Sequence, residues 1–466
     1  MDNIALRRGR CGLSLVLLVT LALAACGPIA APAAANRTSK AVKTPTPAIT
    51  STPRSLLGTT AEALRGVQVE VWHAWFGPEA ALLEAQIAEF NSGNSWGITI
   101  HAASQGDYSS LFDNVTAALE SDERPDVVVA FPEHALAWST SDAVVDLDDY
   151  VRDPLWGFSE SDLADFPAAF LAQDRVGDKR LGMPAQRSAR FLLYNQTWGR
   201  ELGFDSPPTT ADEFRAQACA ANQAMRSDED PKNDGQGGWI VDTHAMTALS
   251  WLLAFDGGPL KEGNYRFLTP NNITALKYVK KLHEDGCAWV SSEATPRDSF
   301  AARAGLFATG SLEELPDQMR AFASAGSADE WTVLPFPGVD KKVFVFYGTS
   351  YILLRSTPAE QLASWLFIRW MLSPENQVRW AQSTDLFPLR LSARSSLVDY
   401  RHSHPQWEAA VALMPSGQTQ PQMASWRTVR IMIGDGFAHV FRVDIPSGQV
   451  AAVLAQMDST VGGLSK

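Results

Sequence analysis

The stretch PDVVVAF, residues 125–131, indicates the fold class of this chain. Its β-branched residues form a continuous apolar run rather than an alternating one, which is typical of a strand buried on both faces of a sheet. Two further strands are predicted upstream of it: VQVEV at 67–71, which alternates apolar and polar residues, and GITIHA at 97–102. We therefore expect three strands within about the first third of the chain.

Helices are predicted in the two intervals between these strands. Pro78 stands in the first turn of one helix, where its missing N–H costs nothing, and Tyr108 opens a second segment with apolar residues on one face. A strand-helix-strand-helix-strand order predicts a mainly parallel sheet flanked by helices. The fold class expected from the sequence is therefore α/β.

The rest of the chain keeps the same alternation of elements. Capping boxes at 210–213 and 357–360 predict two helix starts. Apolar runs between the predicted helices indicate more strands, namely RFLLYN at 190–195, AGLFAT at 304–309, WTVLPFP at 331–337 and VFVFYGTSYILL at 343–354. About 400 residues of such sequence exceed what one hydrophobic core usually holds, so we expect two lobes.

The N-terminus carries a predicted export signal. Arginines at positions 7, 8 and 10 precede an apolar segment, residues 11–25, that is too short to span a bilayer comfortably. Its end, Leu-Ala-Ala-Cys at 23–26, resembles the bacterial lipobox, which implies removal of residues 1–25 and lipidation of Cys26. Two acyl chains on one cysteine suffice for stable anchoring. The alternative is an ordinary signal peptide, with Cys26 present by chance.

The segment after Cys26 is predicted to be a tether. Residues 27–58 contain no aromatic residue and many Ala, Thr, Ser and Pro residues. Such a composition cannot bury enough apolar surface to offset the entropy lost on ordering. We expect residues 26–66 to be a lipidated, disordered connection between the membrane and a folded domain that begins at residue 67.

Charge and cysteine content limit the possible partners and the compartment. The formal charge is −13, and removal of the signal takes away three arginines and one aspartate, which leaves −15. Nucleic acids select basic surfaces, so we expect no nucleic-acid partner. Cys219 and Cys287 are the cysteines left after processing and are expected to form a disulfide in an oxidising compartment. Two buried free thiols are the alternative.

The sequence shows no catalytic or metal-binding motif. The segment DPKNDGQGG, 230–238, is similar to a calcium loop, but it has Lys232 at the third position and Val241 at the twelfth, where oxygen ligands are required. We therefore expect neither a metal nor a cofactor, and we expect no enzymatic activity. A secreted glycosidase, which needs two carboxylates across a scissile bond, is the alternative class.

An ordered series of motifs carries a resemblance to a known family. The motifs are VEVWHAWFGPE, IAEFN, PDVVVAFPEHALAW, VVDLDDYV, GMPAQRSARFLLYNQTWGRELGFDSPPTTADEF, WTVLPFPG, GTSYILL and FIRWMLSPENQVRWAQSTDLFPLR. Their succession over residues 67–440 resembles the bacterial extracellular solute-binding proteins of carbohydrate ABC importers, among them maltose-binding and glycerol-phosphate-binding proteins.

The resemblance implies a two-lobed clamp of the periplasmic-binding-protein type II, with the ligand in a cleft between hinged α/β lobes. Lobe 1 is expected at 67–187 plus 302–343, and lobe 2 at 188–301 plus 344–466. The chain is expected to cross between the lobes about three times, near Ala185–Arg190, Phe300–Ala304 and Val343–Tyr347.

The resemblance also implies the function. We expect a monomer, anchored by its lipid at the outer face of the cytoplasmic membrane, that binds a sugar, oligosaccharide, polyol or sugar phosphate. The closed form would be recognised by the permease subunits of an ABC transporter.

Candidate ligand-binding residues follow from two arguments. Ligands of open α/β sheets bind beyond the carboxyl ends of the strands, which predicts Trp75, Phe76 and Glu133 at the cleft. Aromatic rings there can stack on a sugar, and carboxylates can accept its hydroxyl hydrogens. Glu133 could alternatively be a solvated carboxylate at the rim.

The family pattern implies further contacts by Tyr108, Thr243, His244, Gly310, Ser311, Tyr347, Gly348, Gln422 and Trp426. Arg187, near the first expected crossing, is a further candidate because it could bind a phosphate or carboxylate bidentately. Two of these positions have a structural alternative. Tyr108 could simply begin the buried face of a helix, and Arg187 could pair with an acidic neighbour in the hinge instead of binding an anion.

Overall fold

The computed structural model describes residues 54–121, 123–291 and 296–463. The predicted signal peptide, Cys26 and residues 27–53 of the predicted tether lie outside these residues. Residues 54–66 were predicted to belong to the disordered tether, but Ser55 donates to Asp153 at 2.7 Å and Leu64 is fully buried, so the prediction is wrong for this part of the tether. Within the described residues, no helix is both long enough and apolar enough to cross a membrane.

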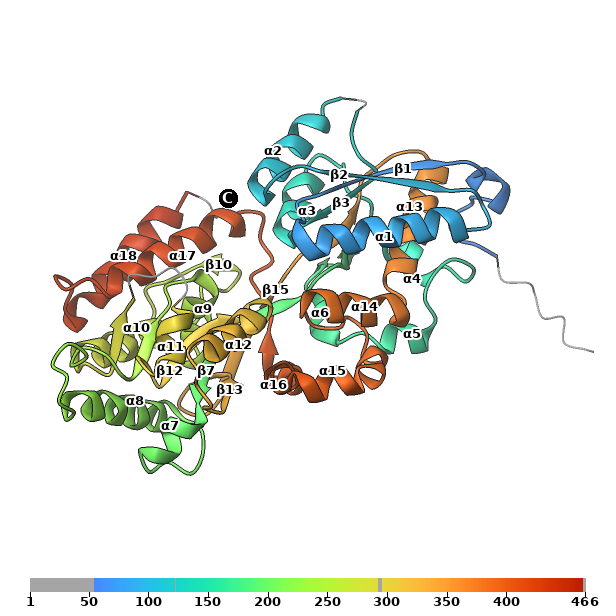
Figure 1. Ribbon diagram of the computed structural model, residues 1–466. Coiled ribbons are helices and arrows are strands. Elements are labelled where there is room, and N and C mark those ends of the chain that lie inside the picture. Colours follow the sequence, from blue (N-terminus) through green and yellow to red (C-terminus); the bar gives the residue numbers. More distant parts are fainter. Residues whose placement is uncertain (1–53, 122, 292–295, 464–466) are drawn as a thin grey trace, which may run out of the picture. The chain divides into compact units, whose positions relative to one another are not determined.

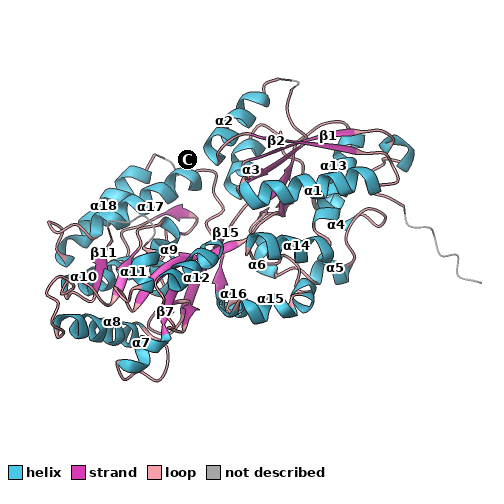
Figure 2. Cartoon of the chain, in the orientation of Figure 1, coloured by secondary structure: helices cyan, strands magenta, loops and turns pink. Residues whose placement is uncertain are grey.

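The first sheet contains five strands, one of which lies within PDVVVAF (Figures 1 and 2). Its order is β2 (Thr99–Ser104), β1 (Gln68–His73), β3 (Val127–Ala130), β16 (Ser350–Leu353) and β6 (Met183–Pro184). Strand β1 pairs in parallel with both β2 and β3, as the strand-helix-strand order predicts. Strand β16, which comes from a distant part of the chain, runs antiparallel to β3 and β6.

Helices flank this sheet where the sequence predicts them. Helix α1 (Gly77–Gly93) has Pro78 in its first turn and buries Leu83, Ile87 and Phe90. Helix α2 (Tyr108–Ala118) begins after Asp107, whose carboxylate accepts two backbone N–H groups. The other helices of this part are α3 (Pro132–Ser139), α4 (Asp148–Arg152), α5 (Glu160–Ala164), α6 (Ala168–Ala172), α13 (Pro358–Met371) and α14 (Pro374–Thr384). We call this sheet with these helices lobe 1.

The second sheet has the order β11 (Ala288–Val290), β8 (Trp239–Val241), β12 (Phe307–Ser311), β7 (Ser188–Asn195), β15 (Lys342–Tyr347) and β14 (Phe336–Pro337). Two further strands join it, since β13 (Trp331–Leu334) pairs with β7 and β17 (Gly417–Gln418) pairs with β15. The sheet is mixed: β8 is parallel to β11 and β12, whereas β7 is antiparallel to β12, β13 and β15.

Lobe 2 consists of this second sheet and the helices that contact it or one another (Figure 1). They are α7 (Gln196–Glu201), α8 (Ala211–Arg226), α9 (Ala245–Ala254), α10 (Pro270–Glu284), α11 (Arg297–Ala301), α12 (Leu315–Ser324), α16 (Pro405–Ala412), α17 (Trp426–Val440) and α18 (Val450–Val461). Both capping boxes form, because Thr210 and Thr357 accept the backbone N–H of the glutamate three residues later.

Short elements complete the described chain. They are the hairpins β4 (Arg175–Val176) with β5 (Lys179–Arg180) and β9 (Leu260–Lys261) with β10 (Asn264–Tyr265), helix α15 (Val398–Ser403), and the 3₁₀ turns η1 (Ala61–Leu64), η2 (Leu312–Glu314), η3 (Ser392–Ser396), η4 (Met414–Ser416) and η5 (Ser447–Gln449).

A disulfide joins Cys219 to Cys287 within lobe 2, with the two Cα atoms 4.4 Å apart. Cys219 lies in α8, and Cys287 lies in the turn between α10 and β11. The bond therefore ties one helix to the start of a strand.

The predicted boundaries of the lobes are wrong in two segments. Residues 302–343 were expected in lobe 1, but β12 and β13 in this range pair with β7 of lobe 2. Residues 350–384, expected in lobe 2, supply β16 to the sheet of lobe 1 and α13 to the helices that cover it. The apolar pattern shows that these segments are buried, but it does not show against which sheet.

Three segments of the described chain connect the two lobes. Two of them lie side by side: the N–H groups of Ala185 and Gln186 both donate to the carbonyl of Thr349, at 2.9 and 3.0 Å. The third follows α14, where the N–H of Phe387 donates to the carbonyl of Arg187 at 3.1 Å. The first predicted crossing is therefore correct, and the last is displaced to Gly348–Thr349. The predicted crossing near Phe300–Ala304 is wrong, because the chain stays in lobe 2 there.

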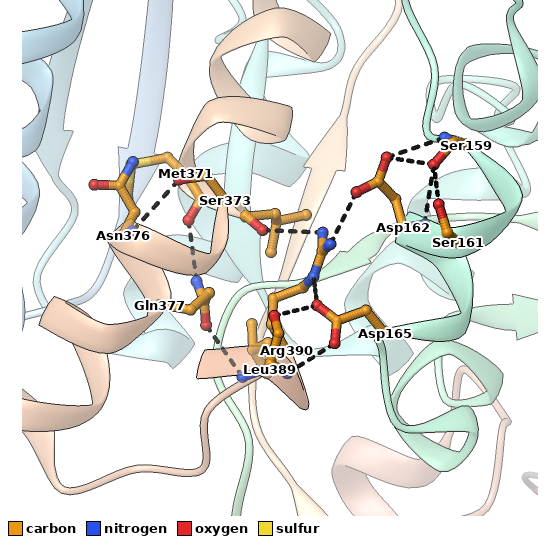
Figure 3. A network of polar contacts seen from close by, with 12 residues as sticks. Ser159, Ser161, Asp162, Asp165, Met371, Ser373, Asn376, Gln377, Leu389 and Arg390 are labelled. Carbon is orange, nitrogen blue, oxygen red and sulfur yellow. Dashed lines mark hydrogen bonds and ion pairs between the residues drawn. The ribbon is translucent and has the colours of Figure 1, made fainter. Parts of the chain in front are cut away.

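The third connection is fixed to lobe 1 by Arg390 (Figure 3). Its buried guanidinium donates to Asp165 at 2.7 Å and to Asp162 at 3.1 Å, and it lies 4.5 Å from the centre of the Phe166 ring. Gln377 of α14 adds a hydrogen bond from the N–H of Leu389 at 3.2 Å. Charge-assisted bonds to a buried arginine hold a segment more rigidly than neutral ones, so this end of the hinge is well anchored.

Candidate functional site

A pocket opens in lobe 2 beyond the carboxyl ends of β8 and β12, the position expected for ligands of α/β sheets. Its volume is about 120 Å³. Three residues predicted to bind ligand, Thr243, Gly310 and Ser311, line it together with Arg190, Asp242, Thr309, Glu314 and Gln318. The structure thus brings these three predictions together in one pocket.

Arg190 is the central charged group of this pocket. It donates to Asp242 at 2.9 Å, and its second carboxylate partner, Glu314, lies 3.4 Å away. Burial by itself would raise the pKa of Asp242, but Arg190 and the Thr247 hydroxyl stabilise the anion, and the pKa is lowered overall. The positive charge of Arg190 is therefore neutralised by carboxylates of the pocket itself.

His244 caps the N-terminus of α9, and its ring Nδ1 accepts the N–H of Met246 at 3.1 Å. Desolvation, followed by the charge of Arg190, lowers its pKa to about 4, so the ring is neutral at physiological pH. Its ring lies 6.4 Å from that of Tyr347. His244 thus sits beside the pocket without being one of the residues that line it.

Tyr347 and Glu313 lie next to the pocket, close to the hinge. The Tyr347 hydroxyl donates to Glu313 at 3.1 Å, and the Ser188 hydroxyl donates to the same carboxylate. Burial and the charge of Glu313 raise the pKa of Tyr347 well above its ordinary value. Tyr347, predicted at the last crossing, is therefore a neutral hydroxyl held in a defined position.

Trp75 was expected to stack on ligand, but the structure places it in the core of lobe 1. Its side chain is only 3% exposed, and its ring packs 4.7 Å from that of Trp380 and edge-on to Tyr351. Its indole N–H donates to Gln186 at 2.7 Å. With its ring faces covered and its polar atom satisfied, Trp75 is a packing residue, and this prediction is wrong.

Phe76, the next residue, has the exposure that Trp75 lacks. Its side chain is 81% exposed at the N-terminus of α1, directly after β1. Exposure of a phenylalanine ring to water is unfavourable, and burial of the ring against another group would gain hydrophobic free energy. The predicted role of Phe76 as a ligand-stacking ring stays a prediction.

Tyr108 and Glu79 belong to the same edge of lobe 1. The ring of Tyr108 lies 4.6 Å from that of Phe131. Burial raises the pKa of Tyr108, and its hydroxyl is hydrogen-bonded by Thr349. Burial and the nearby charge of Glu313 raise the pKa of Glu79. Tyr108 is thus partly a packing residue, while its hydroxyl lies where the two lobes meet.

Glu133 follows β3 as predicted, but it is not a solvated carboxylate. It is 4% exposed and lies 3.3 Å from Arg430 of α17, in lobe 2. The guanidinium of Arg430 also lies 4.5 Å from the centre of the Phe131 ring. Desolvation raises the pKa of Glu133 despite the opposing effect of Arg430. Glu133 therefore takes part in a contact between the lobes.

Arg187 pairs with an acidic neighbour in the hinge, which is the alternative to ligand binding that the sequence left open. The side chain is fully buried and donates to Asp174 and to the carbonyl of Thr349, at 2.7 and 2.6 Å. Its Nη1 and Nη2 groups make their other hydrogen bonds within the protein as well, and the side chain is closed off from solvent, so an anionic ligand has no access to it. The prediction that it binds ligand is wrong for this reason.

Three other residues predicted to bind ligand also have contacts within the protein. A Cβ on Gly348 would lie 2.2 Å from the Gln186 carbonyl, so this glycine allows two hinge segments to approach. Gln422 donates to the carbonyl of Ala172 at 2.5 Å. Trp426 is buried and donates to Gln420 at 2.8 Å. Gly348 and Trp426 therefore offer no free group to a ligand, while Gln422 is exposed and its predicted role in binding stays a prediction.

Sequence reasoning missed several charged residues at the site, namely Glu79, Arg190, Asp242, Glu313, Glu314 and Arg430. Asp242, Glu313 and Glu314 directly follow the ends of β8 and β12, so the rule that ligands lie beyond strand ends could have identified them. Arg190 and Arg430 gave no such signal, because the first lies inside a strand and the second inside a helix.

Comparison with known proteins gives a consistent result. A family model described as bacterial extracellular solute-binding protein matches residues 85–415, more than half of the chain. A binding protein of Brucella abortus (strain 2308) is 19% identical over 308 residues, which cover 65% of this chain and 72% of that protein.

Three solved structures illustrate the fold. The sugar-binding protein MalE of Xanthomonas citri superposes with a TM-score of 0.73 at 18% identity, covering 85% of this chain and 97% of that one. The cyclic α-maltosyl-1,6-maltose-binding protein of Arthrobacter globiformis gives 0.71 at 20% identity, with 85% and 98% covered. UgpB of Mycobacterium tuberculosis, in complex with glycerophosphocholine, gives 0.68 at 18%, with 85% and 98% covered.

These likenesses agree with the two-lobed α/β architecture described above. The match of the family model over most of the folded part decides the assignment: this chain belongs to the bacterial extracellular solute-binding proteins.

Proposed function

We propose that this protein binds a sugar, oligosaccharide, polyol or sugar phosphate where its two lobes meet and delivers it to the permease of an ABC importer. The observation that carries the proposal is the lobe-2 pocket, whose polar groups lie beyond the strand ends and next to the hinge. The relatives of known structure, which bind maltosyl sugars and glycerophosphocholine, support the class of ligand.

The pocket is suited to hydroxyl groups. Asp242 and Glu314 accept hydrogen bonds, while the hydroxyls of Thr243 and Ser311 can both donate and accept. The exposed ring of Phe76 supplies an apolar face of the kind that packs on the C–H face of a pyranose. Polar groups in lobe 2 and an aromatic ring in lobe 1 would then hold one ligand from two sides.

Binding from two sides would couple ligand to lobe closure. A ligand that contacts both lobes binds the closed form more tightly and shifts the population towards it. The connections through Ala185–Gln186 and Gly348–Thr349 are short paired segments, as expected for a hinge. No covalent chemistry is needed for this function.

A binding screen tests the proposal. We expect at least one member of a panel of saccharides, polyols and sugar phosphates to raise the melting temperature and to bind saturably in calorimetry without turnover. Phe76→Ala should weaken that binding by about 1–3 kcal/mol. Val443→Ala, at another exposed apolar position, is the matched control and should leave binding unchanged. Release of product from an oligosaccharide would instead indicate a glycosidase.

Cellular location is a separate part of the proposal. The family is extracellular, and we propose that Cys26 carries a lipid that holds the protein at the outer face of the cytoplasmic membrane as a monomer. Cys26→Ser should move the protein from the membrane fraction to the soluble fraction of the envelope. Unchanged membrane association in this variant would refute the anchor.

A further inference from the structure

The guanidinium groups nearest the candidate site are already neutralised by the protein's own carboxylates. Arg190 pairs with Asp242 at 2.8 Å and with Glu314 at 3.4 Å. Arg430 pairs with Glu133 at 3.3 Å. A phosphate-binding site needs cationic donors that are free to turn to the ligand, and these arginines are committed elsewhere.

The other arginines near the site do not change this conclusion. Arg297, at the edge of the pocket, pairs with Asp317 at 2.5 Å, and Arg187 is fully buried against Asp174. Arg427 holds its guanidinium 4.4 Å from the centre of the Phe112 ring of lobe 1. Arg297 and Arg187 are thus paired with carboxylates, while Arg427 packs against an aromatic ring.

Two carboxylates remain without a cation. Within the described residues, no lysine, arginine or histidine nitrogen lies within 4.0 Å of Glu79 or Glu313. Glu79 belongs to lobe 1 and Glu313 to lobe 2, and both act on the Tyr108 hydroxyl, which lies between the lobes. The charge of Glu313 also raises the pKa of Glu79, which indicates that the two carboxylates repel each other.

We propose that this site discriminates by charge: it takes an uncharged, hydroxyl-rich ligand and rejects the phosphorylated form of the same compound. This inference rests on the proposed function and narrows its ligand class. Ligand hydroxyls can donate to Glu79 and Glu313 and relieve their mutual repulsion. A phosphate carries about −1.5 to −2 charges at neutral pH and offers chiefly acceptor oxygens, so it would add to that repulsion. Unpaired charges placed against the wrong ligand are one of the ways in which a binding site achieves specificity.

The test uses matched pairs in calorimetry: glucose and glucose 6-phosphate, maltose and maltose 1-phosphate, and glycerol and glycerol 3-phosphate. For any pair with a binding member, we expect the uncharged compound to bind at least about 10-fold more tightly. A phosphorylated member that binds as tightly as its partner, or more tightly, overturns the inference and leaves the proposed function standing. Binding of none of the six, nor of any member of the wider panel, would end the proposed function and this inference with it.

A variant that removes the charge of Glu79 tests the role of this residue directly. Glu79→Gln keeps the shape of the side chain and removes its charge, and the oxygen of the amide can still accept the backbone N–H that bonds the Glu79 carboxylate. We expect the ratio between the affinities of the two members of a pair to fall several-fold in this variant. Glu84→Gln, an exposed glutamate on the same helix, is the control and should leave the ratio unchanged. An unaltered ratio in a folded Glu79→Gln protein would refute the role of Glu79.

Discussion

Arg430 and Glu133 form an ion pair that joins the lobes, with a guanidinium nitrogen 3.3 Å from a carboxylate oxygen. Arg430 projects from α17 of lobe 2, and Glu133 from the first turn of α3 of lobe 1. Arg427, one helical turn before Arg430, lies over Phe112 of α2. One face of α17 therefore holds lobe 1 through an ion pair and two contacts between a cation and an aromatic ring.

Replacement of Arg430 should both destabilise and open the protein. Arg430→Ala leaves the buried Glu133 carboxylate without a partner, which costs about 1–3 kcal/mol of unfolding free energy. Urea denaturation measures this loss, and small-angle scattering of the unliganded protein should give a larger radius of gyration. Arg442→Ala removes an exposed pair with Asp444 and is the control, with an expected change below about 1 kcal/mol. An equal effect of both substitutions would contradict the assigned role of Arg430.

The buried Arg187–Asp174 pair should behave as a single structural unit. Because both side chains are buried, removal of one partner leaves an uncompensated charge, and Arg187→Met should cost about 3–5 kcal/mol. Asp174→Asn in the same chain should recover part of that loss, since the remaining group is then neutral. Denaturation of the two single variants and the double variant gives the coupling energy. Additive losses would show that the pair is not a unit.

The contribution of Glu79 to the unfolding free energy should fall as the pH rises. The pKa of Glu79 in the folded protein is raised by burial and by the charge of Glu313, against the lowering effect of its own backbone N–H, whereas the unfolded chain has an ordinary glutamate. Between these two pKa values the folded state binds more protons, so stability is lost as the pH rises through this window. Glu79→Gln should therefore stabilise the protein at pH 7, and the gain should disappear at a pH below the pKa of the unfolded chain.

Thermal unfolding at both pH values measures this difference between wild type and variant. Glu84→Gln again provides the control, because Glu84 is exposed on the same helix. A gain that is the same at both pH values would show that ionisation of Glu79 is not its cause.

The Cys219–Cys287 disulfide should contribute strongly to the stability of lobe 2. The two cysteines are 68 residues apart, and closing a loop of this length stabilises a fold by about 2–4 kcal/mol, chiefly through the unfolded state. Cys219→Ala with Cys287→Ala should lower the melting temperature by several degrees. Wild type measured in a reducing agent should match the double variant, and the agent should have no effect on that variant.

Local features of the sequence predicted most elements correctly. The helix beginning at Gly77, the strand within PDVVVAF and the helix starts at Thr210 and Thr357 depend on caps, prolines and periodicity within a few residues. The pocket residues Thr243, Gly310 and Ser311 were also identified in advance. The predictions of the helices and strands hold because their physical cause lies within the same segment of chain, whereas the three pocket residues were implied by the family resemblance.

The placement of apolar side chains at the site was harder to predict. Trp75 and Phe76 are adjacent and aromatic, yet the first is packed against Trp380 and the second is exposed. Trp380 lies about 300 residues away in the sequence, so no local pattern could reveal which ring it would cover. The same holds for Glu133, whose partner Arg430 comes from the other lobe.

The sequence by itself therefore determined the α/β class, the order of the elements and the position of the helix caps, since each arises from interactions within a short stretch. Only the tertiary structure decided which sheet each strand joins, as shown by VFVFYGTSYILL, which divides at Gly348 into β15 of lobe 2 and β16 of lobe 1. It also decided which charged groups at the site are paired with an opposite charge. The reason is physical: hydrophobicity is non-directional and specifies burial, whereas the choice of partner depends on the packing of segments that are distant in the chain.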